Sequence, residues 1–132
     1  MTTMPTDKYD RSIPLKAIKV QPPSASVVHS QSTYKVHIEL SRNGSKWEKD
    51  AVQKFFPQGR IYSNTLELSD TTVEAIAAGA QTIYSQLASL EREARIAEDA
   101  DIEIQRKQDE EYAAEVARHE NLTRIASEIR FE

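Results

Sequence analysis

The sequence predicts an α+β protein: a small N-terminal antiparallel sheet of three or four short strands, followed by a long C-terminal helix or helical hairpin with coiled-coil-like packing. Three observations predict this fold. All five prolines precede residue 60 and only one glycine follows it, so residues that interrupt regular structure are confined to the first half. One stretch of the first half alternates apolar and polar residues with the period of a strand. The second half repeats apolar residues with the heptad spacing of packed helices.

The same observations divide the chain into three parts. Residues 1–13 are polar and irregular and are expected to form a flexible arm, residues 14–69 a small basic β-rich domain, and residues 70–132 a long acidic helical segment. Residues 1–60 carry ten Lys/Arg and five Asp/Glu, a net charge of +5, whereas residues 61–132 carry seven and sixteen, a net charge of −9. This asymmetry indicates two parts with different roles, or subunits that attract each other.

Strands are expected at three places in the first half. Residues 15–20 form a short apolar-rich stretch that fits an edge strand, and residues 21–31, with two prolines and several serines, fit a loop. In residues 34–40 apolar side chains at even positions alternate with polar side chains at odd positions, which predicts a strand with one buried face. Residues 60–69 are expected to form a further strand.

Residues 46–56 allow two interpretations. Asn43-Gly44 suits a type I′ turn, which would make residues 46–56 the partner strand of a hairpin. Ser45 and Glu48 instead have the spacing of a capping box, which would start a helix. The hairpin is the preferred prediction, because an Asn-Gly turn requires a partner strand, and the helix is the alternative.

The long helical pattern begins at a second capping-box sequence, Thr71-Thr72-Val73-Glu74. Apolar residues then recur at alternating spacings of three and four, typical of a helix that packs along another helix. The predicted helix-packing interface consists of Val73, Ile76, Ala80, Ile83, Leu87 and Leu90. The alternative is that this face covers the protein's own sheet.

Further along, the apolar seam is interrupted and a second, weaker set of apolar residues follows in a shifted phase. This set consists of Tyr112, Val116, Leu122, Ile125 and Ile129. No proline or glycine interrupts residues 80–132, and so long a helix exceeds what a small sheet can cover. We therefore expect either a bend near residues 97–101 into a helical hairpin, or packing against copies of the chain or a partner.

The sequence carries no pattern of a catalytic, cofactor-binding or metal site. Three histidines lack a second ligand at metal spacing; they are His29, His37 and His119. Asp99, Asp101, Glu103 and Glu110 match positions of a calcium loop, but Ile104 stands where that loop needs glycine. The three glycines are isolated, so no phosphate-binding loop is formed, and no serine lies in a Gly-x-Ser-x-Gly turn. We expect a protein that is not an enzyme and binds no cofactor or small-molecule substrate.

The expected function is therefore non-enzymatic: an oligomeric interaction or assembly protein, an adaptor or structural component, that self-associates or docks a partner through its C-terminal helix. A viral or phage accessory role fits such a chain. No apolar run approaches the roughly 20 residues of a membrane span, and no secretory leader is visible, so a cytoplasmic location is expected. The alternative function is binding of single-stranded nucleic acid by the basic, aromatic-bearing sheet domain. Its candidate contact residues are Lys35, Lys46, Trp47, Lys49 and Lys54.

Overall fold

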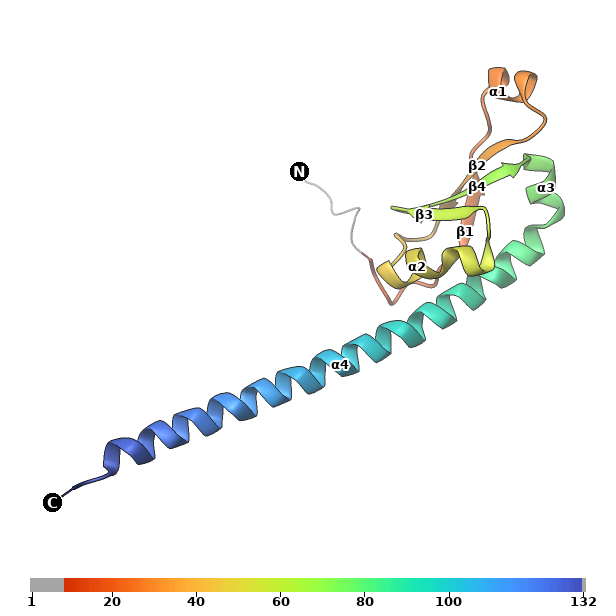
Figure 1. Cartoon of the computed structure of the whole chain (residues 1–132). Helices are drawn as coiled ribbons and strands as arrows, with labels where there is room; N and C mark the ends of the chain where they lie inside the picture. The colour runs from red at the N-terminus through yellow and green to blue at the C-terminus, as the bar shows by residue number, and fades with distance from the viewer. Residues whose placement is uncertain (1–8, 132) are drawn as a thin grey trace, which may run out of the picture. The chain divides into compact units, whose positions relative to one another are not determined.

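The computed structural model describes residues 9–131 and has the predicted α+β fold (Figure 1). Its elements are β1 (Ala17–Val20), α1 (Ala25–Ser30), β2 (Tyr34–Leu40), α2 (Lys46–Phe55), β3 (Gly59–Tyr62), β4 (Thr65–Thr71), α3 (Val73–Ala78) and α4 (Ala80–Glu128). Most of the predicted arm, residues 1–8, lies outside the described residues.

The chain forms two compact units, divided between Ile96 and Ala97. We call their described parts the head (residues 9–96) and the tail (residues 97–131). The head extends beyond the predicted boundary at residues 69/70, because α3 and the first part of α4 supply buried side chains to its core.

The head contains a four-stranded antiparallel sheet in the order β1-β2-β4-β3. The central strand β2 has the predicted alternation, with the apolar residues at even positions buried. The single strand predicted at residues 60–69 is in fact a hairpin of β3 and β4, since Tyr62 pairs with Thr65 across a two-residue turn. Ser63 has φ 49° in that turn, so neither glycine nor proline marked it in the sequence. The predicted loop at residues 21–31 also contains a short helix, α1, whose N-terminus is capped by Ser24.

The hairpin prediction for residues 46–56 is wrong, because these residues form helix α2. The Ser45 hydroxyl accepts a hydrogen bond from the Glu48 backbone N–H at 3.1 Å, and the Glu48 carboxylate accepts one from the Ser45 N–H at 2.8 Å. Together they form a complete capping box. A type I′ turn needs positive φ at both central residues. No glycine of residues 9–131 has a positive φ, so Asn43-Gly44 does not form such a turn.

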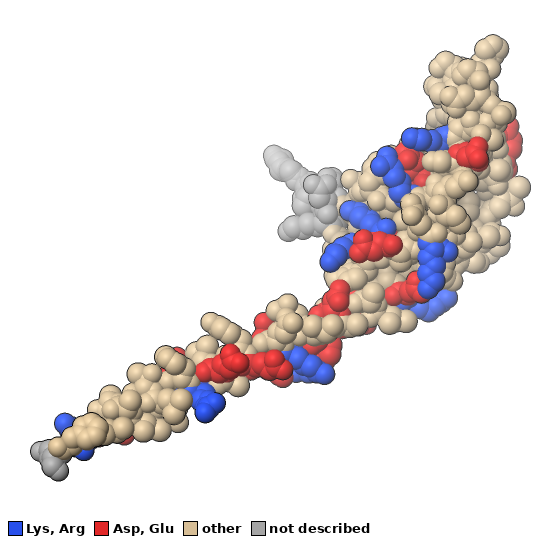
Figure 2. All heavy atoms as spheres, viewed as in Figure 1, with Lys and Arg blue, Asp and Glu red and all other residues tan. Residues whose placement is uncertain are grey.

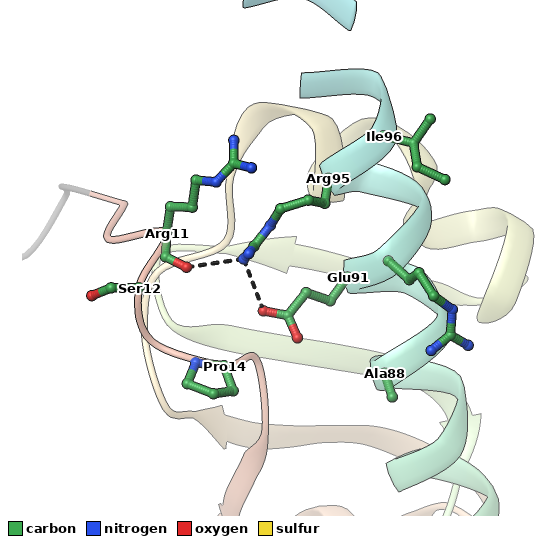
Figure 3. A pocket seen from close by; sticks show the side chains of 8 residues that line it. Arg11, Ser12, Pro14, Ala88, Glu91, Arg95 and Ile96 are labelled. Atoms are coloured by element: carbon green, nitrogen blue, oxygen red, sulfur yellow. Dashed lines mark hydrogen bonds and ion pairs between the residues drawn. The ribbon is translucent and has the colours of Figure 1, made fainter. Parts of the chain in front are cut away.

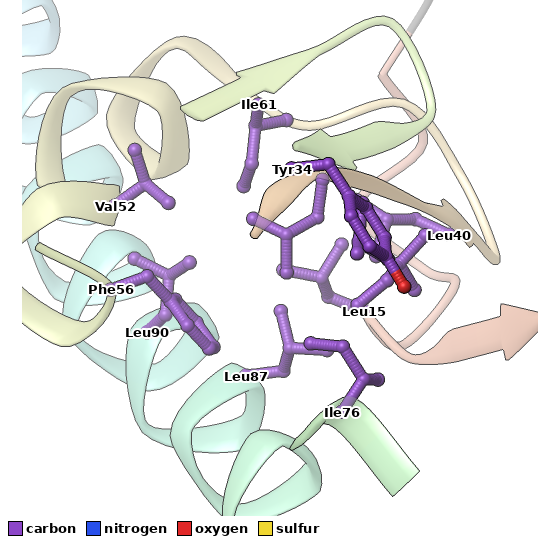
Figure 4. Close-up of a cluster of buried hydrophobic side chains, with 12 residues drawn as sticks. Leu15, Tyr34, Leu40, Val52, Phe56, Ile61, Ile76, Leu87 and Leu90 are labelled. Atoms are coloured by element: carbon purple, nitrogen blue, oxygen red, sulfur yellow. The ribbon is translucent and has the colours of Figure 1, made fainter. Parts of the chain in front are cut away.

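The core of the head lies between the sheet and the helices α2, α3 and α4 (Figure 4). Three residues of the predicted helix-packing interface are buried there: Ile76, Leu87 and Leu90. Val73 and Ile83 pack against this core while partly buried, and Ala80 is exposed. Up to residue 94 the heptad pattern thus covers the protein's own sheet, which is the alternative interpretation of that face.

Gly44 is a position where the packed core leaves no room for a side chain. A Cβ atom at this position would lie 2.5 Å from Ile61 Cγ2. We expect Gly44→Ala to lower the free energy of unfolding by about 1–3 kcal/mol, the usual cost of overpacking. Urea denaturation followed by circular dichroism measures this change.

Gly79→Ala is the matched control for Gly44→Ala. Gly79 joins α3 to α4, and an added Cβ atom would meet only the Ala75 carbonyl oxygen, at 3.4 Å. Because alanine favours helix over glycine, this variant is expected to be as stable as the unmodified chain or slightly more stable. Equal stability of the two glycine variants would contradict the packing described for Gly44.

Helix α4 runs from Ala80 to Glu128 without a break, so the chain does not bend into a helical hairpin near residues 97–101. Residues 80–96 belong to the head and residues 97–128 to the tail. Within the described part of the chain, none of the helices combines the length and the apolar character that crossing a membrane requires.

Candidate interaction surface

The tail exposes apolar side chains along its whole length. Every residue from Asp99 to Phe131 is exposed, although eight of them are large hydrophobic residues. These are Ile102, Ile104, Tyr112, Val116, Leu122, Ile125, Ile129 and Phe131. Isolated exposed apolar residues are normal on a protein surface, but a contiguous series of them marks an interaction site.

Three of these residues continue the heptad register of the head, which corrects the expected shift of phase. Leu122, Ile125 and Ile129 each follow a buried residue of α4 by 35 residues, or five heptads (122 − 87, 125 − 90 and 129 − 94). Ile104 keeps the same register, whereas the other four are displaced from it: Ile102, Tyr112, Val116 and Phe131. From Ile104 onward, the residues of the tail in this register form one face, which we call the tail seam. It consists of Ile104, Gln108, Glu111, Glu115, Arg118, Leu122, Ile125 and Ile129.

The charge of the tail is concentrated in its first half. Residues 97–115 contain eight Asp/Glu and two Lys/Arg, a net charge of −6, whereas residues 116–131 contain two and three, a net charge of +1. Figure 2 shows the acidic side chains of the tail in red, gathered along the first half, with isolated basic side chains nearer its end. The two halves of the tail therefore differ in electrostatic character.

Some tail charges pair along the helix itself. Arg106 pairs with Glu103 and with Glu110, and Arg124 pairs with Glu128, at the i,i+3 and i,i+4 spacings that bring side chains together. The hydrogen bond from Arg106 lowers the pKa of the Glu103 carboxyl. Because these pairs are solvent-exposed, they stabilise the helix only slightly.

A buried ion-pair network in the head was not predicted from the sequence. Arg42 donates through Nη1 and Nη2 to the two carboxylate oxygens of Glu48, at 2.7 Å each, and through Nη2 to Glu91 at 3.0 Å. Its Nε donates to the Ile13 carbonyl at 2.5 Å, and its guanidinium stacks 4.8 Å from the centre of the Tyr9 ring. The Arg42 and Glu48 side chains are each only 2% exposed. The network ties the N-terminal segment, α2 and α4 together.

The electrostatics of this network keep Arg42 charged. Burial by itself lowers the pKa of the guanidinium, but the hydrogen bonds and charges of Glu48 and Glu91 outweigh burial, so the pKa lies above its ordinary value. With both partners engaged, the network has a structural role in holding the head together. Of the three charged residues Arg42, Glu48 and Glu91, only Glu48 was indicated by the sequence, through the capping box.

The candidate nucleic-acid contacts fall on different surfaces. Lys46, Trp47, Lys49 and Lys54 lie on α2, which packs against the inner face of the sheet, and Lys54 pairs with a glutamate of α4, Glu93, at 2.5 Å. Lys35 lies at an odd, exposed position of β2 and therefore on the opposite, outer face. The structure thus brings together the four candidate residues of α2, whereas Lys35 lies apart from them on the other face of the sheet.

The outer face of the sheet carries a row of paired charges beside Lys35. Glu67 on β4 accepts a hydrogen bond from Arg60 Nε at 2.8 Å, and its other oxygen is 3.0 Å from His37 Nε2. The hydrogen bond from Arg60 lowers the pKa of Glu67 against the opposing effect of burial, and His37 adds to the lowering. Much of the positive charge of this face is therefore neutralised within the protein.

An open cleft of the head, with a volume of ≈ 480 Å³, lies between residues 11–14 and the α4 segment of residues 88–96 (Figure 3). Arg95 projects into it and donates to the Arg11 carbonyl at 2.9 Å, with Glu91 at 3.4 Å. These contacts fasten the N-terminal segment to α4, which gives the cleft a structural role. Across residues 9–131 no three histidine, aspartate or glutamate side chains gather as metal ligands.

Comparison with known proteins adds no functional assignment. No protein-family model matches the chain, and no curated protein or solved structure matches it either. The tail is the surface of the described chain on which exposed apolar side chains are most concentrated.

Proposed function

We propose that this protein is a non-enzymatic interaction or assembly protein, an adaptor or structural component, whose tail helix binds another helix. One observation carries this proposal: α4 continues for 32 residues after the head ends at residue 96, and the tail seam keeps the register of the buried seam while exposed to water. Exposed apolar residues at heptad spacing, as at Leu122, Ile125 and Ile129, are typical of coiled-coil packing.

The energetics favour a partner for this surface. Full burial of a leucine or isoleucine side chain contributes roughly 1.5–3 kcal/mol relative to full exposure. Leu122, Ile125 and Ile129 are 51%, 43% and 54% exposed. Each would therefore contribute on the order of 1 kcal/mol if a partner covered it. Because α4 is a single helix up to Glu128, the tail does not fold into a helical hairpin, and a helix of another chain would supply that cover.

The charge pattern gives nucleic-acid binding less support. The basic residues that such binding would use lie on two faces of the sheet, and Lys54 and Arg60 are already paired with carboxylates. The tail adds net negative charge, which repels a polyanion. Association through the tail is therefore the function that the geometry supports best.

We expect replacement of the three large seam residues near the end of the tail to abolish association. The variant Leu122→Ala/Ile125→Ala/Ile129→Ala removes apolar surface while keeping side chains that favour helix. Light scattering of the unmodified chain should give a molar mass above the 15.0 kDa of one chain, and the variant should fall to 15.0 kDa.

The matched control places three alanines on the opposite side of the same helical segment, as Glu120→Ala/Thr123→Ala/Ser127→Ala. At 3.6 residues per turn these positions face away from the tail seam. The control should keep the mass of the unmodified chain. A control that loses association together with the seam variant would show that the seam is not the contact surface.

A further inference from the structure

We infer that the tail helix binds the tail helix of a second copy of this chain, with the two helices antiparallel. This inference rests on the proposed function and specifies its partner. It follows from the distribution of charge along the tail and from the residues that occupy the tail seam.

The charges of the two halves favour the antiparallel orientation. Parallel helices in register would place the first half of the tail, with a net charge of −6, against its own copy. Antiparallel helices place this half against residues 116–131, with a net charge of +1. Packed helices lie about 8–10 Å apart, close to the screening length of about 8 Å at physiological salt, so this repulsion is felt. Antiparallel pairing with a second copy thus avoids the repulsion between two acidic halves.

The tail seam selects one register for the antiparallel pair. When Glu115 faces the partner's Arg118, two-fold symmetry makes Arg118 face the partner's Glu115, and two ion pairs form at the centre. The same register places Ile104 opposite the partner's Ile129 and Ile129 opposite the partner's Ile104. Apolar contacts between Ile104 and the partner's Ile129 therefore close the pair at its two ends. Between these ends and the charged centre, Gln108 and Glu111 face the partner's Ile125 and Leu122.

Neighbouring registers lack this complementarity. A shift by one heptad in one direction places Glu115 opposite the partner's Glu111, so like charges meet twice. A shift in the other direction places Glu111, Glu115 and Arg118 all opposite apolar side chains, the partner's Ile129, Ile125 and Leu122, whereas the proposed register places only Glu111 in this way. Polar residues in a seam lower the stability of a coiled coil but specify its register, and the centre of this seam fits that role.

Both central residues are available for contacts between chains. Among residues 9–131 neither Glu115 nor Arg118 forms an ion pair, whereas Arg106 and Arg124 are held by glutamates of their own helix. Both side chains are exposed. Within residues 9–131, Glu115 and Arg118 are thus an acid and a base without an ion-pair partner, three residues apart on the tail seam.

Disulfide cross-linking of the full-length chain tests the orientation directly, because the protein has no cysteine of its own. Ile104→Cys and Ile129→Cys variants are prepared separately, mixed in equal amounts and oxidised. In the proposed pair residue 104 meets the partner's residue 129, while identical positions lie about 37 Å apart, far beyond disulfide reach. We expect the mixed dimer to exceed the same-position dimers by about tenfold, since only the mixed pair has disulfide geometry. Glu120→Cys, on the opposite side of the helix, gives the background of random collisions.

A charge exchange gives a second readout that needs no cysteine. Glu115→Arg should raise the dissociation constant of the pair about tenfold, because two ion pairs become two repulsive contacts. The exchange Glu115→Arg/Arg118→Glu should restore the original value, since each charge again faces its opposite. In a parallel pair identical residues face each other, so neither change would produce this loss and recovery.

The outcomes separate the orientation from the function. A mass above 15.0 kDa with predominantly same-position cross-links would overturn the antiparallel pair and leave the proposed assembly function in place. Failure of the Glu115→Arg/Arg118→Glu exchange to restore association would likewise overturn the antiparallel pair and leave the proposed assembly function in place. An unmodified chain that stays at 15.0 kDa would overturn self-association itself.

Discussion

Replacing Arg42 with alanine is expected to lower the free energy of unfolding of the head by about 3–5 kcal/mol, because it leaves a buried carboxylate without its counter-ion. Glu48 is 2% exposed and holds both Arg42 nitrogens at 2.7 Å, and Glu91 loses its 3.0 Å contact as well. Urea denaturation followed by circular dichroism measures the loss.

Lys19→Ala is the matched control for Arg42→Ala. Lys19 and Glu39 form an ion pair at 3.9 Å in which both side chains are largely in water, 63% and 36% exposed. Exposed pairs of this kind contribute little to stability, so the denaturation midpoint should barely change. If Arg42→Ala were as stable as this control, the buried network would not be what holds the N-terminal segment, α2 and α4 together.

Leu87→Ala is expected to destabilise the head by about 2–5 kcal/mol, through the lost burial of the side chain and the cavity left behind. Leu87 is 1% exposed in the core of the head. The same substitution at Leu122, at the same heptad position five repeats later, should leave the unfolding of the head unchanged, because Leu122 is 51% exposed and lies outside it. Denaturation measures the head, and light scattering of the same samples measures association.

These two leucines distinguish folding from assembly. Leu87→Ala should change denaturation first, and Leu122→Ala should change the molar mass first. An exchange of these effects, with Leu122 controlling the stability of the head, would contradict the division of the seam between the two units. Leu87 substitutions are therefore tests of folding, although the residue belongs to the interface predicted from the sequence.

Local patterns predicted the parts of the fold that depend on local physics. The strand of residues 34–40 follows from alternation alone, since one face is buried and the other meets water. The long helix follows from heptad spacing and the absence of proline and glycine after residue 79. The α2 segment was mispredicted because the Asn-Gly signal was weighted above the capping box. Glu48 decides that segment, since it caps the helix and also binds Arg42.

Contacts between distant residues could not be predicted in this way. Arg42 and Glu91 are 49 residues apart, and nothing in the sequence marks them as partners. The β3–β4 turn was missed because Ser63 adopts a positive φ without glycine beside it. The heptad pattern showed where apolar residues lie on α4, but not where the sheet that covers them ends. The point at which the sheet stops covering α4 separates the buried apolar residues from the exposed tail seam. This point therefore determines where the candidate site begins.

Pairing of the tails is tested by the molar mass of the unmodified chain, measured by light scattering over a dilution series. We expect a mass near twice the 15.0 kDa of one chain at high concentration, decreasing toward 15.0 kDa on dilution as the tails separate. A mass of 15.0 kDa across the whole series would contradict this pairing, because the exposed seam of the tail would then have no second copy as its partner.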